Sequence, residues 1–182
     1  HKLNFVIFFI EGRLTIMVTY RIISRYKELG DLESLHDGLE KSQLFITCNK
    51  CPLYDPKEIL EKLKDDSFRF ITATQQSRKD LTYRLQITLP SDVSKLRELV
   101  RIALTKGKYL NSQWCKTSDA VWAACDSYKF EHTEYIQNAH KYMTSEIYLK
   151  FALNNKGQAF FKPTWFALPA VDRKSTRLNS SH

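Results

Sequence analysis

The chain has 182 residues, of which 28 are Lys or Arg and 20 are Asp or Glu, so its formal net charge is +8. Hydrophobic residues make up 43% and aromatic residues 13%, with five Gly and five Pro, which excludes a disordered chain, a collagen-like fibre and a low-complexity array. The longest apolar run, Phe5–Ile10, is far shorter than the roughly 20 residues of a membrane span. We therefore expect one folded domain in a cytoplasmic protein with no membrane partner.

The two ends of the chain are expected to lie outside this domain. Residues 1–16 precede the first methionine, Met17, and read as translation upstream of the true start. Residues 171–182 form a polar tail without periodicity that resembles translated adapter sequence. Without residues 1–16 and 173–182 the formal charge falls to +4, which is compatible with an acidic partner such as RNA and also with a simple aid to solubility.

The segment before residue 54 predicts short elements. Residues 19–25 are β-rich and alternate, which predicts a strand. Three leucines recur at helical spacing and predict a helix over 31–41. A short apolar run over 43–47 follows. We expect residues 17–53 to form an N-terminal strand–helix extension.

Two helices are predicted by their caps and apolar spacing. Asp55 is expected to cap a helix that has Pro56 at its first position and ends near residue 65. Ser91 is expected to cap a second helix that ends near Gly107. The apolar residues of this second helix recur at spacings of three and four: Val93, Leu96, Val100 and Leu104.

The pattern between these two helices is mixed. Residues 67–72 are expected to be extended, and residues 75–81 are polar and ambiguous. Residues 85–89 alternate between apolar and polar, which predicts a strand.

The C-terminal half is predicted to be a sheet. Aromatic residues crowd the chain from residue 108 onward, as β-propensity favours. The clearest strands are 145–153 and 158–161, which are separated by a turn of Asn and Gly. The fold class that we predict is α+β, with helices packed on a C-terminal antiparallel sheet within residues 54–170.

The four cysteines raise the question of zinc. Cys48 and Cys51 form a CxxC pair that could supply two ligands. Nine residues separate Cys115 from Cys125, unlike a second knuckle, and buried cysteines often serve only as small apolar side chains. We predict no metal or cofactor, with zinc at Cys48 and Cys51 as the weaker alternative.

His132-Thr133-Glu134 matches half of the zinc site of nucleobase deaminases, but in those enzymes PCxxC follows the HxE half. Here the CxxC comes first, so a polar pair on a strand is the simpler interpretation. The chain also has no Walker loop, GxGxxG, HExxH or GxSxG motif.

Lysines and a tyrosine lie on or beside three predicted C-terminal strands. Because side chains alternate in a strand, Tyr148 and Lys150 share a face, with Lys129 and Lys162 on neighbouring strands. Metal-independent RNA cleavage needs a base, a cation for the phosphorane and an acid, roles that Lys and Tyr can fill. The plainer interpretation is that these lysines point to solvent and protect a sheet edge.

Seven segments of the chain occur in the order in which a known protein family has similar segments. Residues 54–63 and 93–105 are similar to the first and second helices of that family, and residues 68–72 to its basic VRFT step. Residues 109–112, 125–129, 148–150 and 161–162 stand where the family has F-Y-K-S, Q-D-V-Y-R, Y-L-K and F-K. This order resembles the motility quorum-sensing regulator (MqsR) toxins, within the RelE-like mRNA endoribonucleases. The resemblance covers roughly residues 54–163, and residues 17–53 have no counterpart in it.

The resemblance implies a metal-independent mRNA endoribonuclease of a toxin–antitoxin system, with mRNA as substrate and a cognate antitoxin protein as partner. It places Tyr148, Lys162 and Lys129 at catalytic positions. The candidates for RNA binding are Lys150, Arg69 and Asn111.

Two positions depart from the family. Asn111 stands where the family has a lysine and Cys125 where it has a glutamine, and an amide cannot replace the charge of a lysine. The alternatives are a non-catalytic RNA-binding module, or a protein-interaction or inhibitor module from a mobile element.

Overall fold

The computed structural model describes residues 5–10, 13–18, 21–29, 35–36, 38–46, 51–72, 75–118, 121–136, 140–156 and 158–166. Within these ranges the side chains of residues 5–18, 71–72, 76, 84, 136 and 160–166 are outside the description. The elements are, in chain order, β1 (Phe5–Ile10), β2 (Arg13–Val18), β3 (Arg21–Ile22), the 3₁₀ helix η1 (Lys41–Leu44), β4 (Phe45–Ile46), α1 (Pro56–Lys62), β5 (Phe70–Thr72), α2 (Gln75–Leu85), α3 (Val93–Thr105), β6 (Lys108–Ser118), β7 (Val121–Ile136), β8 (Lys141–Leu153) and β9 (Ala159–Phe166).

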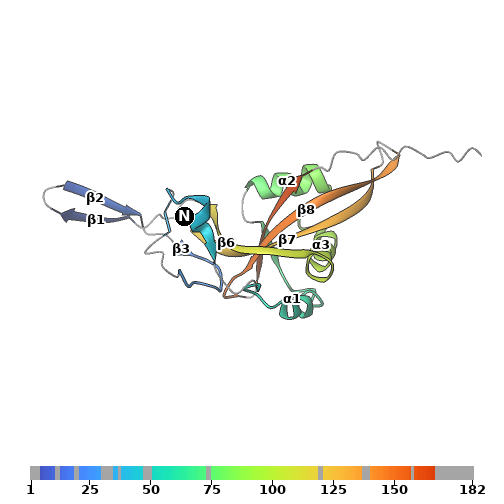
Figure 1. Cartoon of the computed structure of the whole chain (residues 1–182), viewed down its shortest axis with the longest axis horizontal. Helices are drawn as coiled ribbons and strands as arrows, with labels where there is room; N and C mark the ends of the chain where they lie inside the picture. Colours follow the sequence, from blue (N-terminus) through green and yellow to red (C-terminus); the bar gives the residue numbers. More distant parts are fainter. Residues whose placement is uncertain are drawn as a thin grey trace, which may run out of the picture.

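The fold is α+β, as predicted, and its main sheet is mixed (Figure 1). The strand order is β4-β6-β7-β8-β9-β5, and β3 pairs with β7. The long strands β6 to β9 are antiparallel neighbours, as expected for the C-terminal half, whereas β5 joins β9 and β3 joins β7 in parallel. Strands β1 and β2 form a separate two-stranded sheet.

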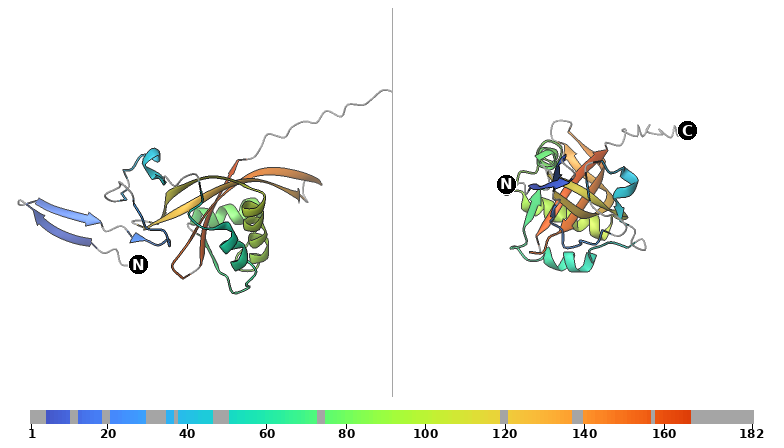
Figure 2. Two further views of the ribbon diagram at one scale, coloured as in Figure 1. Left: turned by 60° about the horizontal axis from the view of Figure 1, so that its bottom comes forward. Right: turned by 90° about the vertical axis from the view of Figure 1, so that its left-hand side faces the viewer.

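The long strands curve, and the three helices are gathered beside them (Figure 2). One cluster of buried side chains joins α3 to the sheet, through Leu96 and Leu99 on the helix and Tyr128, Leu149 and Phe151 on β7 and β8. The rings of Tyr128 and Phe151 stack with centroids 5.6 Å apart. This core holds one face of β7 and β8, and from Lys129 onward along β7 the alternate residues of the other face are partly or fully exposed.

Helix α1 begins as its sequence predicts. Asp55 is the N-cap and its Oδ1 accepts a 2.9 Å hydrogen bond from the Lys57 backbone N–H, and Pro56 occupies the first helical position, where no N–H partner is needed. The loop after α1 is held by Arg97 of α3. Its guanidinium donates to four backbone oxygens, those of Leu63, Asp65, Asp66 and Phe68, at 2.8 to 3.0 Å.

A buried carboxylate ties the segment before α1 to the sheet. The carboxylate of Asp126 on β7 accepts hydrogen bonds from the backbone N–H groups of Leu53 and Tyr54, both at 3.0 Å, and from the Ser112 hydroxyl. Burial raises the pKa of Asp126. The Tyr54 hydroxyl in turn donates to the Ala124 carbonyl oxygen at 2.7 Å. The conformation that leads into α1 is therefore specified by β7.

The N-terminal segment packs on the same sheet. Leu35 is buried in a second cluster with Trp114, Trp122 and Ala124, and Arg25 makes a two-pronged ion pair with Glu58 of α1, at 2.8 and 3.0 Å. Within the strand predicted over 19–25, Arg21–Ile22 form β3 and Ser24 forms an isolated bridge with Asn154. Residues 19–20 of that prediction lie outside the described residues.

The helix predicted over 31–41 is wrong in its described part. Residues 35–36 and 38–40 are not helical, because the leucines there fill the cluster around the two tryptophans as irregular chain. Residues 31–34 and 37 of that prediction lie outside the described residues.

Three details around α2 and α3 complete or correct the sequence predictions. The ambiguous segment 75–81 is part of α2, whose inward side is formed by Ser77, Leu81 and Leu85. The strand predicted over 85–89 is wrong, because α2 ends at Leu85 and Gln86 then adopts a φ of 53°. The N-cap of α3 is Asp92 rather than Ser91, and the Asp92 side chain accepts from the Thr88 N–H at 2.8 Å.

None of the helices in the described part of the chain is long and apolar enough to span a membrane.

Candidate functional site

Alternation along β7 and β8 separates structural from available side chains. On β7, Asp126 and Tyr128 point into the buried side, whereas Lys129 is partly exposed. On β8, Leu149 is buried and Tyr148 is partly exposed. Residues directly opposite in an antiparallel pair share a face, and Lys129 lies opposite Tyr148. These two candidates from the sequence are therefore neighbours on the face away from the core.

A carboxylate joins them. The Lys129 Nζ lies 2.6 Å from Oε2 of Glu146, and the Tyr148 hydroxyl donates to Oε1 of the same carboxylate at 2.6 Å. The Lys129 Nζ is also 5.5 Å from the centre of the Tyr148 ring. We call Lys129, Glu146 and Tyr148 the Lys–Glu–Tyr cluster.

The contacts in the cluster favour the charged forms of both ionisable partners. The hydrogen bonds from Lys129 and then from Tyr148 lower the pKa of Glu146 below its ordinary value. The hydrogen bonds with Glu146 and then with Tyr148 raise the pKa of Lys129. Glu146 is therefore a carboxylate and Lys129 a cation throughout the neutral pH range.

The cluster lies in an open depression of about 660 Å³. Lys108 is the register partner of Lys129 on β6 and lines the depression with Lys106, and both lysines are solvent-exposed. Glu131, which lies opposite Glu146, adds a second carboxylate. The depression thus holds three lysines and two glutamates, a net positive charge.

This arrangement has the groups that phosphodiester chemistry requires. A carboxylate can accept a proton, a phenol can donate one, and lysine cations can stabilise negative charge on phosphate oxygens. The base and the acid are in direct hydrogen-bond contact, so a proton can pass between them.

The other sheet candidates form the next row of the same ladder. Lys150 lies opposite Ser127 on one side and Lys162 on the other, and Asn111 lies opposite Ser127. The Lys162 backbone is thus in register with Lys150, while its side chain is outside the described residues. The Asn111 Oδ1 and the Ser127 Oγ are buried and make no hydrogen bond in the described structure.

Arg69 is not brought to this depression. It lines a separate hollow of about 330 Å³ together with Lys62 and Lys156. Of the three RNA-binding candidates, Lys150 and Asn111 are therefore next to the cluster and Arg69 is at a different place on the surface.

The cysteine pair cannot be assembled from the described residues, because Cys48 lies outside them. Cys51 is exposed, and Cys115 and Cys125 are buried. The interaction with Cys115 and burial raise the pKa of the Cys125 thiol well above its ordinary value. Among the described residues no group of three or more His, Cys, Asp or Glu side chains is placed to hold a metal ion.

The sequence analysis missed Glu146. The signal was present, because Glu146 is two residues before Tyr148 and therefore shares its face. Its role depends on the register between β7 and β8 that sets Lys129 beside it, and the alternation within β8 alone does not give that register.

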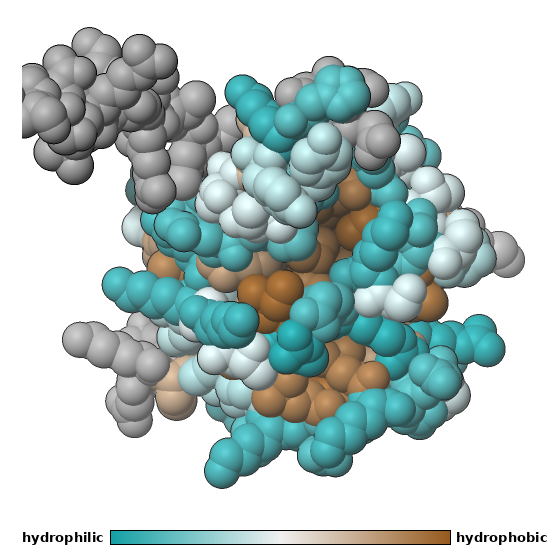
Figure 3. Space-filling model, turned by 90° about the vertical axis from the view of Figure 1, so that its right-hand side faces the viewer, coloured by the Kyte–Doolittle hydropathy of each residue, from teal (hydrophilic) through white to brown (hydrophobic). Residues whose placement is uncertain are grey.

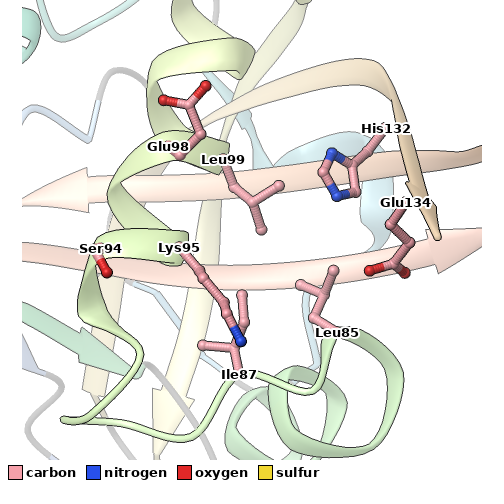
Figure 4. A pocket seen from close by; sticks show the side chains of 8 residues that line it. All are labelled: Leu85, Ile87, Ser94, Lys95, Glu98, Leu99, His132 and Glu134. Carbon is pink, nitrogen blue, oxygen red and sulfur yellow. The ribbon is translucent and has the colours of Figure 1, made fainter. Parts of the chain in front are cut away.

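Two residues of the His132-Thr133-Glu134 motif, His132 and Glu134, line a different hollow, of about 380 Å³, between β7 and α3. The His132 ring points toward Leu99, and the Glu98 carboxylate points away from the hollow (Figure 4), where Arg101 binds it at 2.7 Å. The apolar part of the hollow comes from Leu85, Ile87 and Leu99. Apolar surface between hydrophilic side chains is visible across this end of the molecule (Figure 3). The hollow offers a partly apolar surface rather than a set of convergent ligands.

Comparisons with known proteins add no relative to this description: no family model, no curated protein and no solved structure matches the chain.

Proposed function

We propose that this chain is a metal-independent endoribonuclease of the toxin type, which cleaves mRNA at the depression that holds the Lys–Glu–Tyr cluster. The observation that supports it is the carboxylate of Glu146, which is shared by Lys129 and Tyr148 at 2.6 Å on each side. The order of segments that resembles the MqsR toxins supports the same choice of face. In this proposal the helices and the long antiparallel strands correspond to the RelE-like arrangement.

The first half of the reaction is attack within the RNA. Glu146 takes the proton of a 2′-hydroxyl, and the 2′-oxygen forms a bond to phosphorus. The bond from phosphorus to the 5′-oxygen breaks, and the leaving oxygen takes the proton of the Tyr148 hydroxyl. The products are a 2′,3′-cyclic phosphate and a 5′-hydroxyl, with Glu146 protonated and Tyr148 as the phenolate.

The second half restores the site. In the free protein the Tyr148 hydroxyl is hydrogen-bonded to Glu146, so once the products leave, the proton of Glu146 can return to Tyr148 along this contact. Lys129 favours the return, because it stabilises the Glu146 carboxylate. No water or metal is needed to reset the two groups.

The lysines hold the phosphate. Lys129 is closest to the reacting groups and stabilises the charge that develops on the phosphorane. Lys106 and Lys108 line the same depression and attract the flanking phosphates. Lys150 and Lys162 belong to the adjacent row and are proposed to extend this binding surface.

The biological setting is part of the proposal. A toxin of this type acts on mRNA in the cytoplasm and is silenced by a cognate antitoxin protein. Induced expression of the chain is therefore expected to arrest growth, and Lys129→Ala is expected to relieve the arrest.

Purified protein tests the chemistry directly. The full chain is incubated with RNA in EDTA, and Glu146→Gln and Lys129→Ala are expected to lower the cleavage rate at least 100-fold. Glu61→Gln and Lys64→Ala are matched controls, because these residues form an exposed ion pair of the same 2.6 Å length on and just after α1. Cleavage that persists in Glu146→Gln at the wild-type rate would refute the proposed site.

A non-catalytic RNA-binding module is the second candidate. It is favoured by Asn111, which stands where the resembling family has a lysine and whose Oδ1 is buried. Salt-sensitive binding of RNA that stays intact through long incubation with the wild-type chain would support this candidate over the enzyme.

A further inference from the structure

Two tyrosines are exposed at the far end of the β7–β8 hairpin. The exposed fractions are 47% for Tyr135 and 74% for Tyr142. The two residues are directly opposite each other, and their rings meet edge to face with centroids 5.2 Å apart. This part of the hairpin extends beyond the helices (Figure 2). We call Tyr135 and Tyr142 the tyrosine pair.

The tyrosine pair shares a face with the Lys–Glu–Tyr cluster. Tyr142 is six residues before Tyr148 on β8, and Tyr135 is six residues after Lys129 on β7. Even separations in a strand preserve the face. At about 3.3 Å per residue the pair is about 20 Å from the cluster. From the Lys129–Tyr148 row of the cluster, the face continues through the row of Glu131 and Glu146 and the row of Thr133 and Thr144 to the tyrosine pair.

We propose that the tyrosine pair stacks a nucleobase of the same single-stranded RNA whose phosphate occupies the depression. This inference rests on the proposed function and adds a second contact to it. A base stacks on an exposed phenol ring whatever its identity, because every base has a π-face. The occupant is RNA rather than an apolar segment because the same strand face continues to a depression lined by three lysines, whose positive charge attracts phosphates.

The intervening rows indicate how the strand runs. Glu131 is exposed and lies opposite Glu146, so phosphates are repelled from this stretch. The sugar–phosphate backbone is therefore expected to turn away from it while the bases follow the strand face.

The separation predicts a minimum length of substrate. At the roughly 3.4 Å rise of a stacked strand, about six nucleotides cover the 20 Å. A tetranucleotide can fill the depression without reaching the tyrosine pair. Bases paired in a duplex do not have a free face, so the site is selective for single strands.

Binding to uncleavable RNA tests the inference. Fluorescein-labelled 2′-O-methyl RNAs of 12 and of 4 nucleotides are used, because the methyl group removes the nucleophile. Tyr142→Ala is expected to weaken binding of the 12-mer by about 5- to 100-fold, the usual effect of losing one base–aromatic stack, with the 4-mer unchanged within twofold. Tyr142→Phe keeps the ring and is expected to bind like the wild type.

A matched control separates stacking from loss of any exposed ring. Tyr83 on α2 is 81% exposed, and Tyr83→Ala is expected to change neither affinity. Lys129→Ala is expected to weaken the 12-mer and the 4-mer alike, because it removes a contact in the depression.

Each contrary result has its own meaning. If Lys129→Ala weakens binding and Tyr142→Ala does not, the stacking proposal is overturned and the proposed function stands. If the wild type binds neither RNA at low salt, both fail. If Tyr142→Ala leaves RNA affinity intact but abolishes self-association in sedimentation, the tyrosine pair is a protein contact and the stacking proposal is overturned.

Discussion

The Tyr148 hydroxyl donates a 2.6 Å hydrogen bond to Oε1 of Glu146, two residues earlier on the same strand. The second oxygen of this carboxylate binds Lys129 from the neighbouring strand at 2.6 Å. A proton donor, an acceptor and a cation are thereby held on one exposed face by the pleat of β8 and its register with β7.

If Glu146 and Tyr148 act as one unit, their substitutions are not additive. Glu146→Gln and Tyr148→Phe are each expected to lower the cleavage rate by about 10²- to 10⁴-fold. The cleavage rate of the double variant is expected to lie within about tenfold of the rate of the slower single variant, because either change already stops the proton exchange. Single-turnover rates with Tyr83→Phe as the control measure this, and multiplication of the two losses would contradict it.

The pH dependence of cleavage follows from the contacts of Glu146. Lys129 and Tyr148 lower the pKa of Glu146, so the fall in rate on the acid side is expected below the ordinary value of about 4.3. The pKa of Lys129 is raised, so the cation persists beyond about pH 10. A rate profile measured on wild-type protein should be flat from about pH 5 to 9. An acid limb near pH 6.5 would instead assign the base to a histidine.

Salt dependence tests the roles of Lys106 and Lys108. Each phosphate contact to single-stranded RNA contributes about 0.7 to the slope of log affinity against log salt. Lys106→Ala and Lys108→Ala are each expected to reduce the slope by about this amount, measured with the uncleavable 12-mer. The control is Lys64→Ala, which removes an exposed lysine that is in an ion pair with Glu61, and it is expected to leave the slope unchanged. An equal reduction of the slope in this control would mean that the lysines act only through the overall charge of the protein.

Among the arginines whose side chains the structure describes, Arg97 is expected to contribute most to the free energy of unfolding. Its guanidinium donates to four backbone oxygens and lies 5.7 Å from the centre of the Phe70 ring, a geometry that lysine cannot reproduce. Arg97→Lys is expected to lower the free energy of unfolding by about 2–3 kcal/mol, or the Tm by about 4–12 °C.

The control for this prediction is on the same helix. Arg101 forms an exposed pair with Glu98, and pairs of this kind contribute at most about 1 kcal/mol. Arg101→Lys is therefore expected to shift the Tm much less than Arg97→Lys. Equal shifts in thermal unfolding would show that the four carbonyl contacts are not important.

Local signals were sufficient for some elements and not for others. Helices α1 and α3 could be predicted because a cap and an apolar stripe lie within each segment. Helix α2 could not, because its sequence is largely polar and only Ser77, Leu81 and Leu85 among its described side chains are buried by the rest of the fold. Residues 85–89 alternate because Leu85, Ile87 and Leu89 pack against the same core from the end of α2 and the loop after it, without forming a strand.

The site shows the same division. The shared face of Tyr148 and Lys150 follows from alternation within one strand. The contact of Lys129 with Glu146 depends on the register between β7 and β8, which the sequence pattern does not specify. Arg69 was grouped with the site by its charge and its position in the resembling family, and the fold places it in another hollow.

The products of cleavage test the central claim most directly. The wild-type chain is incubated with a defined single-stranded RNA in EDTA, and the new ends are identified by mass spectrometry. Attack by the 2′-oxygen predicts a 2′,3′-cyclic phosphate on one fragment and a 5′-hydroxyl on the other, with no cleavage of the same sequence made as DNA. RNA that remains intact at equimolar protein, or fragments that carry a 5′-phosphate and a 3′-hydroxyl, would contradict the assignment of Glu146 and Tyr148 as base and acid.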